Sequence, residues 1–240
     1  MVVLRFLLIA CFFAGLVWGL NYFYNSDFFK IDEVEIGNNI HYSDKEVMDT
    51  IPGMIGSNIF ELDMKDIEER LTDSFSWLKS VEIEREFPRK VKIEFTERQA
   101  YVISYNRGQY FLIDEEGVVI EVLKQDGLAD YDDTLVVKNA LDYSPALGEK
   151  IAKKNILSCA EIYKFMDPPI KDIILEARIK KEGFDKISFF TEDYNTIVFG
   201  DSDNITEKNA VLKQILNNLS KEDKNYSIID ISDYQSPVIR

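Results

Sequence analysis

The sequence is poor in the residues on which most enzymes and disulfide-bonded extracellular domains depend. Its 240 residues include only two cysteines and one histidine. Cys11 and Cys159 lie far apart in the chain, and Cys11 falls inside a long apolar run, so an intramolecular disulfide framework is excluded. No zinc-binding, nucleophile-elbow or phosphate-loop motif occurs. The sequence therefore predicts no metal site, no cofactor and no catalytic centre, with His41 as an exposed loop residue.

Positive charge is also scarce. The chain has 28 Lys and Arg against 43 Asp and Glu, which gives a formal net charge of -15. An acidic surface repels phosphate backbones and anionic headgroups, so the composition excludes nucleic acid and electrostatic binding to acidic lipid. What the sequence does contain is 46% apolar and 12% aromatic residues, enough for one large core or two modest ones.

The chain begins with an apolar run. Residues 6–20 carry no formal charge, and the flanking positions extend the stretch to residues 2–24. As a helix this stretch is about 30 Å long, which matches the hydrocarbon core of a bilayer. Arg5 lies near its start, and acidic residues follow it from Asp27 onward. We therefore expect a single transmembrane helix with a cytoplasmic N-terminus and the rest of the chain outside the cytoplasm.

Three other interpretations of this run fit less well. A cleavable signal peptide has a shorter apolar segment, and no small-x-small cleavage site flanks Tyr24. Residues 8–11 resemble a lipoprotein processing box, but an apolar segment follows them instead of a polar tether. A buried core helix rarely opens a chain with an apolar surface on every side.

Residues 28–98 combine strand and helix patterns. Two short helices are expected: a capping box of Ser43 and Glu46 opens the first, and the second begins near Asp63. Strand patterns precede and follow them, at residues 28–36, 78–86 and 91–97. The last two of these alternate apolar and charged residues and predict a β-hairpin with one solvated face. The order strand, helix, helix, strand, strand allows the helices to cover one face of a three-stranded sheet.

Three ordered motifs stand out in this region, at residues 29–38 (FKIDEVEIGN), 56–63 (GSNIFELD) and 77–88 (WLKSVEIEREFP). They resemble the POTRA domain of the bacterial division proteins FtsQ and DivIB. Their order, their spacing and the preceding apolar helix all agree with that family. The resemblance implies an α+β protein with a membrane anchor at 1–27, a β-α-α-β-β POTRA-like domain at 28–98 and a further domain at 99–240.

Residues 99–240 predict a mixed β-rich domain with at least two helices. The expected strands are residues 110–113, 118–120, 135–137, 173–179, 186–191, 196–199, 228–231 and 237–239. One helix is expected at 149–166, with Cys159 as a core residue, and another after a cap formed by Asn204 and Glu207. Residues 101–108 are the expected junction with the preceding domain.

The family resemblance continues more faintly here. Residues 111–114 with Gly117 resemble an early hairpin of the family, residues 197–200 the strand before its last helix, and residues 229–231 its terminal strand. Many members continue that strand as Asp-Leu-Arg-Tyr, whereas this chain has Ser-Asp-Tyr at residues 232–234. This difference changes which side chains would contact a partner, but it does not affect pairing with a partner through backbone hydrogen bonds.

The resemblance implies a division scaffold in the plasma membrane at the septum. Such a protein binds the single-pass proteins FtsB/DivIC and FtsL outside the cytoplasm, and so helps to localise or regulate septal peptidoglycan synthesis. If the terminal strand offers an open edge, the expected partner-binding residues are Ile228, Ile229, Ile231, Tyr234, Val238 and Ile239. A basic cluster that could contact an acidic partner segment comprises Arg85, Arg89, Lys90 and Lys92, of which the first three are the candidates.

Two other functions remain open at this point. A membrane-anchored envelope enzyme could use carboxylates alone, and 43 acidic residues supply too many pairs for any one of them to be informative. A POTRA-type chaperone of protein translocation is expected to carry tandem POTRA units or a β-barrel, and the sequence has neither pattern.

Overall fold

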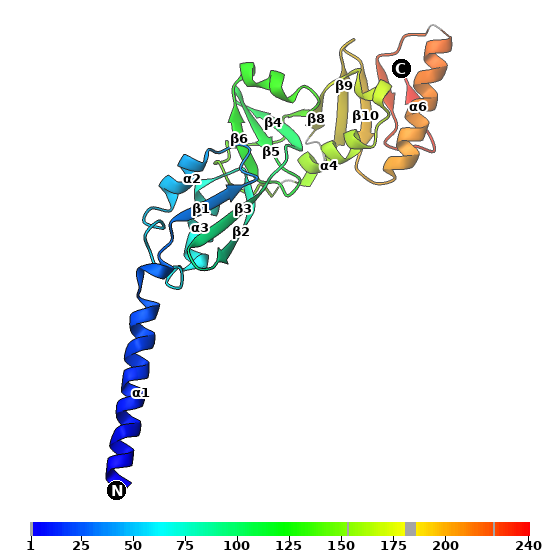
Figure 1. The fold of residues 1–240 in the computed structure, drawn as a ribbon. Coiled ribbons are helices and arrows are strands. Elements are labelled where there is room, and N and C mark those ends of the chain that lie inside the picture. The colour runs from blue at the N-terminus through cyan, green and yellow to red at the C-terminus, as the bar shows by residue number, and fades with distance from the viewer. Residues whose placement is uncertain (1, 153, 181–185, 223) are drawn as a thin grey trace. The chain divides into compact units, whose positions relative to one another are not determined.

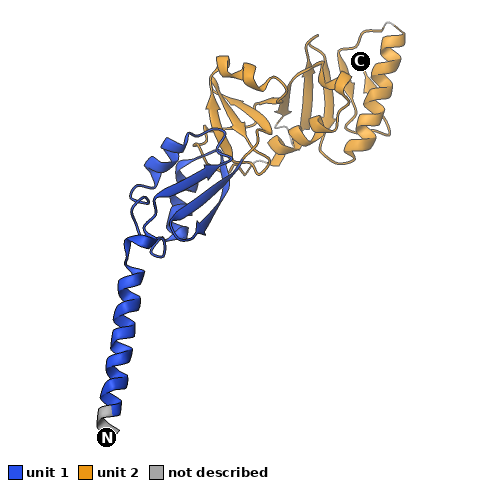
Figure 2. Ribbon diagram, viewed as in Figure 1, with its two compact units in different colours: residues 1–97 blue, residues 98–240 orange. Residues whose placement is uncertain are grey.

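The computed structural model of the protein describes residues 2–152, 154–180, 186–222 and 224–240. The chain divides into two compact units, residues 1–97 and 98–240 (Figure 2). Each unit has its own cluster of buried apolar side chains. The predicted α+β fold, with an N-terminal helix, a β-α-α-β-β domain and a β-rich second part, is confirmed.

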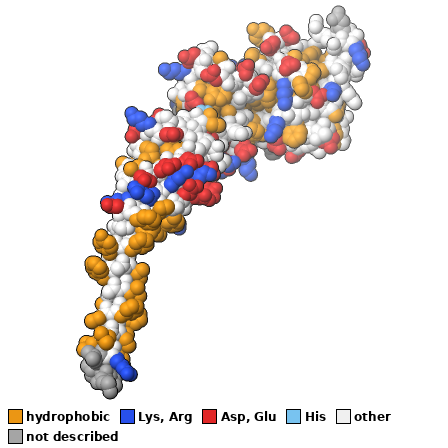
Figure 3. All heavy atoms as spheres, viewed as in Figure 1, with side chains coloured by type: hydrophobic (Ala, Val, Ile, Leu, Met, Phe, Trp, Pro, Cys, Tyr) orange, Lys and Arg blue, Asp and Glu red, His pale blue; other side chains and the backbone are white. Residues whose placement is uncertain are grey.

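The first unit begins with the long helix α1, Val2–Tyr24 (Figure 1). Its segment Arg5–Tyr24 has a mean hydropathy of 1.9, and none of it is buried against the rest of the protein. Figure 3 shows hydrophobic side chains along this helix. The helix is therefore long and apolar enough to cross a bilayer, and its side chains stay exposed in the described structure.

A small α+β domain follows α1. Its elements are the 3-10 turn η1 (Asp27–Phe29), β1 (Glu33–Gly37), α2 (Asp44–Thr50), α3 (Met64–Ser74), β2 (Leu78–Glu86) and β3 (Lys90–Glu97). The sheet order is β1-β3-β2, with β1 parallel and β2 antiparallel to β3. The predicted order of elements is confirmed. The first strand is shorter than expected, because η1 and a single β-bridge at Lys30 occupy its start.

Both helices begin at the predicted caps. The Ser43 hydroxyl accepts a hydrogen bond from the Glu46 amide, and the Glu46 carboxylate accepts one from the Ser43 amide, which completes the capping box of α2. Asp63 accepts hydrogen bonds from the amides of Lys65 and Asp66 at the start of α3. The helices cover one face of the sheet and bury a core formed mainly by Val47, Ile51, Ile67, Leu71, Val91, Ile93 and Phe95.

The second unit contains one nine-stranded sheet with the order β12-β11-β10-β9-β8-β7-β4-β5-β6. The strands are β4 (Val102–Asn106), β5 (Gln109–Ile113), β6 (Val119–Leu123), β7 (Val136–Lys138), β8 (Ile174–Lys180), β9 (Lys186–Thr191), β10 (Thr196–Gly200), β11 (Ile228–Asp230) and β12 (Val238–Ile239). Three neighbouring pairs are parallel, namely β4 with β7, β7 with β8 and β10 with β11.

The helical segments of this unit are η2 (Gln125–Tyr131), α4 (Lys154–Lys164), α5 (Pro168–Lys171) and α6 (Ile205–Lys221). Buried residues of α4 and α6, including Cys159 and Leu212, pack in the same core as the sheet. The predicted core position of Cys159 is confirmed, and burial raises the pKa of its thiol. This thiol is therefore kept protonated and unreactive.

Two sequence-based boundaries are wrong. Residues 101–108 are not a junction, because β4 lies inside the sheet with Val102 and Ile103 completely buried. The helix expected at 149–166 starts at Lys154, with position 153 outside the described residues. Pro168 does not simply stop that helix; it opens α5 at the first helical positions, where a missing N–H is tolerated.

Candidate functional site

The candidate site is the edge of the large sheet formed by the C-terminal strands. Strand β11 pairs in parallel with β10, and Ile229 lies opposite Ile197. On its other side β11 pairs antiparallel with β12, and Ile229 lies opposite Ile239. The predicted open strand at residues 228–231 is therefore paired on both sides. The edge of the sheet is β12, which within the described part of the chain pairs with β11 alone.

The hydrogen bonds of β12 show which backbone groups are left at this edge. Arg240 and Ile228 exchange two hydrogen bonds, with N to O distances of 2.9 and 3.1 Å. The next pair, Ile239 with Ile229, is then a non-hydrogen-bonded pair of the antiparallel ladder. The N–H and C=O of Ile239 consequently point away from β11. They form one donor and one acceptor at the outer edge of the sheet.

The six predicted contact residues divide into three pairs by exposure. Ile229 and Ile231 have no exposed surface and belong to the core, so their side chains are not available to a partner. Val238 and Ile239 are exposed over 45% and 46% of their surface. The two remaining residues, Ile228 and Tyr234, are partly buried. Alternation along β11 explains why Ile229 and Ile231 are both buried. Val238 and Ile239 are both exposed because they form the edge strand β12.

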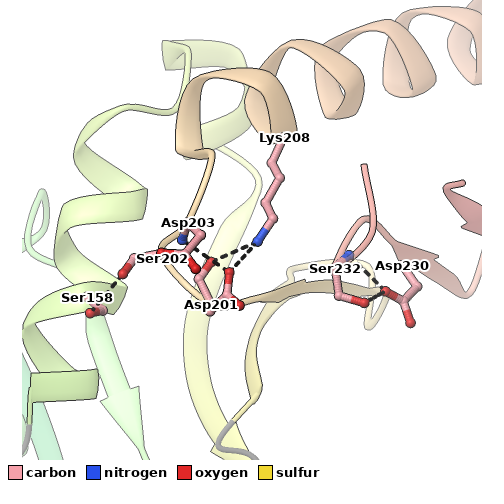
Figure 4. Close-up of polar contacts among 7 residues, drawn as sticks. All are labelled: Ser158, Asp201, Ser202, Asp203, Lys208, Asp230 and Ser232. Atoms are coloured by element: carbon pink, nitrogen blue, oxygen red, sulfur yellow. Dashed lines mark hydrogen bonds and ion pairs between the residues drawn. The ribbon is translucent and has the colours of Figure 1, made fainter. Parts of the chain in front are cut away.

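The loop of residues 231–237 brings β12 back beside β11. At its start, the Asp230 carboxylate accepts hydrogen bonds from the Ser232 amide at 3.0 Å and the Ser232 hydroxyl at 2.6 Å (Figure 4). Gly200 at the end of β10 has φ +86°, and a Cβ there would lie 2.9 Å from the Ser232 Cβ. This position therefore requires glycine both for its backbone conformation and for the close approach of this loop.

A buried lysine holds the start of α6 against the end of β10. Lys208 is only 2% exposed, and its ammonium donates hydrogen bonds to the side-chain and backbone oxygens of Asp201 at 2.7 and 3.1 Å (Figure 4). The same nitrogen lies 5.2 Å from the centre of the Phe199 ring. The hydrogen bond from Lys208 lowers the pKa of the Asp201 carboxyl. These contacts connect α6 to the strand beside β11.

The predicted Asn204 cap of α6 is wrong. Asn204 adopts a left-handed conformation with φ 51°, and its side chain makes no capping hydrogen bond. Instead, the preceding loop is held by Asp201 and by contact of the Ser202 hydroxyl with that of Ser158 on α4, at 3.3 Å (Figure 4). Sequence reasoning missed Lys208. The available signal was its position between Ile205 and Leu212 in the apolar stripe of the helix, where a charged residue is unexpected.

The structure does not bring the predicted basic cluster together. Arg85 lies on the helix-covered face of β2 and donates to the carbonyls of Ile59 and Leu62 at 2.8 and 2.7 Å. Lys90 lies on the opposite face, where hydrogen bonds to Glu35 and Glu86 raise its pKa. The other two residues pair with acids of their own domain, Arg89 with Asp32 and Lys92 with Glu94. These side chains are therefore already bound by carbonyl or carboxylate groups of their own domain.

Buried carboxylates were the remaining candidates for catalysis. Asp114 is paired with Arg98 at 2.5 Å and accepts a backbone hydrogen bond from Val118 at 2.7 Å. Glu176 lies between Lys138 and Arg178, at 2.5 and 2.6 Å. Both carboxylates are thus engaged by cationic side chains of their own unit. Among the described residues, no three His, Cys, Asp or Glu side chains converge as metal ligands.

His41 is exposed, as expected, but it has partners. Its ring stacks on Trp77 with a centroid distance of 3.7 Å. Its Nδ1 lies 2.5 Å from a carboxylate oxygen of Glu97, which is itself nearly buried. Contact with an aromatic ring and a carboxylate at the end of β3 gives the imidazole a role in joining the loop after β1 to that strand.

Comparisons with family models cover nearly the whole chain outside α1. Residues 29–98 match the model described as POTRA domain, FtsQ-type. Residues 101–232 match the model described as Cell division protein FtsQ/DivIB, C-terminal. The second match includes β11 and ends before β12.

Individual proteins that are similar in sequence point to the same family. The chain is 33% identical over 109 residues to Cell division protein FtsQ of Neisseria meningitidis, a match that covers 45% of this chain and 43% of that protein. It is 28% identical over 98 residues to Cell division protein DivIB of Clostridium botulinum, covering 41% and 38%. A match to Cell division protein FtsQ of Streptomyces bingchenggensis is weaker, at 22% identity, but covers 94% and 80%. The matched segment thus spans less than half the length of the first two relatives.

Proposed function

We propose that this chain, which belongs to the FtsQ/DivIB family of cell division proteins, acts as a membrane-anchored scaffold of the division machinery. Its partners in this proposal are the single-pass proteins FtsB/DivIC and FtsL. By holding them at the septum, the protein helps to localise or regulate septal peptidoglycan synthesis without itself catalysing a reaction.

The anchor in this proposal is α1. The segment Arg5–Tyr24 is apolar and uncovered by other parts of the protein, and Arg5 is the charged residue at its N-terminal end. The segment that follows the helix carries Asp27, Asp32 and Glu33. Because positive charge favours the cytoplasmic side, both folded units lie outside the cytoplasm in the plasma membrane, where the partner proteins expose their own extracytoplasmic segments.

The observation that carries the binding proposal is the open edge of β12. An extended partner segment can add as a further strand by pairing with the outward N–H and C=O of Ile239, while the exposed Val238 and Ile239 side chains contact alternate residues of the partner. Ile228 and Tyr234 lie close enough to this edge in sequence to contribute contacts at its rim. A short edge is sufficient, because confinement of both proteins to one membrane raises their effective concentration.

The basic residues are not included in this interface. Arg85, Arg89 and Lys90 already bind groups of their own domain, so using them would require those contacts to be broken. An enzymatic function is disfavoured for a similar reason. Asp114 and Glu176 are each held by cationic side chains of the same unit, so using either carboxylate in catalysis would require those ion pairs to be broken.

The proposal is tested by replacing Ile239 with proline in the full chain. Ile239→Pro removes the outward N–H but no hydrogen bond within the protein, and proline is tolerated on edge strands. We expect capture of FtsB/DivIC in membranes, measured by photocrosslinking from Tyr234, to fall at least tenfold. Ile239→Ala is the matched control, because it shortens the side chain and keeps the N–H, and its effect should be smaller. If Ile239→Pro captures the partner as well as the wild type does, β12 is not the binding edge.

A further inference from the structure

A cluster of aromatic side chains surrounds the C-terminal end of α1. We name it the aromatic base, and it comprises Phe28 and Phe29 of η1, Phe60 of the loop before α3, and Phe87 of the β2–β3 hairpin. Adjacent rings are in contact, with centroid distances of 5.0, 4.8 and 5.2 Å along the series. Yet Phe28, Phe60 and Phe87 are 53%, 38% and 58% exposed. Three large apolar side chains from three separate loops therefore present one uncovered surface.

The aromatic base is attached directly to α1. The ring of Phe23 lies 5.0 Å from that of Phe29, and the ring of Tyr24 stacks on Phe60 at 5.1 Å. The Asn58 side-chain amide donates to the Tyr24 carbonyl at 2.7 Å. That carbonyl belongs to the last turn of the helix and has no partner within it. Ring contacts and a hydrogen bond to the last carbonyl thus join the end of the helix to the domain.

Backbone hydrogen bonds reinforce this junction. The segment after η1 pairs with the loop before α3: Ile31 donates to Ser57 at 3.0 Å, and Ile59 donates to Phe29, also at 3.0 Å. The segment between α1 and β1 is therefore not a free linker. Figure 3 shows hydrophobic side chains continuing from α1 onto the adjoining end of the domain.

The length of α1 determines how deep this surface lies. A hydrocarbon core of about 30 Å takes about 20 helical residues. Counted from Arg5, whose charge belongs at the opposite interface, those residues end at Tyr24. The headgroup region extends roughly 5 to 8 Å further. Rings in contact with Phe23 and Tyr24 therefore fall within that region, where aromatic side chains are favoured.

We propose that the aromatic base is a membrane-contact surface, with Phe28, Phe60 and Phe87 inserted at the boundary between headgroups and acyl chains. The occupant is lipid, because the surface is continuous with the membrane-spanning helix and lies at headgroup depth. The insertion is apolar, and so it does not depend on the electrostatic lipid binding that a net charge of -15 excludes. Its consequence is that the small α+β domain that follows α1 rests on the bilayer instead of moving freely at the end of the helix.

This inference rests on the proposed anchoring of α1, and the experiment tests the two separately. The full chain is reconstituted in lipid nanodiscs with one copy per disc, and a Phe87→Cys, Cys11→Ser variant is labelled with the fluorophore NBD. Cys159 is buried and stays unlabelled. We expect phospholipids with a doxyl group near the headgroup to quench this label at least threefold more than a label at Ile40→Cys. Ile40 is 84% exposed and follows β1, at the end of the sheet away from the hairpin, which makes it the matched control.

The wild-type chain labelled at Cys11 supplies the second readout. Quenching at Cys11 by deep doxyl groups establishes that α1 crosses the bilayer. If Cys11 is quenched and position 87 is quenched no more than position 40, the membrane-contact surface is wrong and the anchor stands. If Cys11 is not quenched, the anchoring proposal itself fails. A third result would also overturn the inference. If the label at position 87 has blue-shifted emission only in discs with two copies, and doxyl lipids do not quench it, the surface contacts protein and not lipid.

Discussion

At the scale of single residues, the second unit contains a charged side chain at a buried position where the apolar pattern of the helix predicts a hydrophobic residue. Lys208 lies in the buried stripe of α6, and its ammonium is compensated by Asp201, whose side chain is largely exposed. The pair is asymmetric: one charge is buried and the other is solvated. Loss of the carboxylate leaves a buried cation, whereas loss of the cation leaves a carboxylate that water can solvate.

This asymmetry predicts that two substitutions lower the free energy of unfolding by different amounts. Asp201→Asn should lower the free energy of unfolding by about 1 kcal/mol, a value reduced from that of a fully buried pair because Asp201 is screened by solvent. Lys208→Met keeps the volume of the side chain and should cost less. Urea unfolding of both variants in nanodiscs measures the difference. If Lys208→Met lowers the free energy of unfolding as much as Asp201→Asn does, or more, then an uncompensated buried ammonium is not what destabilises Asp201→Asn.

The same pair predicts a pH dependence. The pKa of the Asp201 carboxyl is lowered in the folded protein, so its contribution is complete above the unfolded pKa of about 4 and is lost as pH falls through the folded pKa. Unfolding free energy should therefore fall more steeply below pH 4 in the wild type than in Asp201→Asn. Parallel acid profiles of the two proteins would contradict this assignment.

At the scale of elements, local sequence determines where helices begin in the first unit and fails to do so in the second. Ser43 and Asp63 cap their helices through hydrogen bonds to residues two or three positions away. The start of α6 is instead set by Lys208, which reaches back seven residues to Asp201, and by the contact of Ser202 with Ser158 on α4, which lies 44 residues away. Helix α2, with seven residues, is too short to be stable alone, so its cap has a measurable effect.

The capping box of α2 is tested with Ser43→Ala. Removing the hydroxyl should lower the free energy of unfolding of the first unit by about 1 kcal/mol, because the Glu46 amide loses its acceptor. Ser43→Thr keeps a hydroxyl and should stay within a few tenths of a kcal/mol of the wild type. Fluorescence of the nearly buried Trp77 during urea titration reports this unit. Equal losses in the two variants would assign the effect to packing rather than to the cap.

At the scale of the whole molecule, the two units have separate cores, one formed by the three-stranded sheet with α2 and α3 and the other by the nine-stranded sheet with α4 and α6. The C-terminal strands belong fully to the second core, since Ile229 and Ile231 are completely buried. Truncation after Tyr226 would therefore damage the fold of the second unit, and loss of partner binding in that truncated chain would not identify the binding edge. The Ile239→Pro variant avoids this difficulty.

Separate cores predict separate unfolding transitions. Leu71→Ala should destabilise the first unit by about 2 to 5 kcal/mol and leave the second transition in place, because Leu71 is completely buried in the first core alone. Ile229→Ala should do the reverse. Trp77 fluorescence follows the first unit, and far-ultraviolet circular dichroism follows both. A single transition that both substitutions shift equally would show that the units unfold together.

The long apolar helix, the order of elements in the first unit and the family resemblance were all predictable from the sequence, because these depend on apolar length, on the period of short segments and on caps formed between near neighbours. The tertiary structure was needed to show that β4 is an internal strand, that β12 covers β11 and that Arg85 and Lys90 lie on opposite faces. It also brought the four rings of the aromatic base together from three loops. Each of these features depends on strand pairing or side-chain contact between residues far apart in the chain, and no local pattern specifies which distant segment becomes the neighbour.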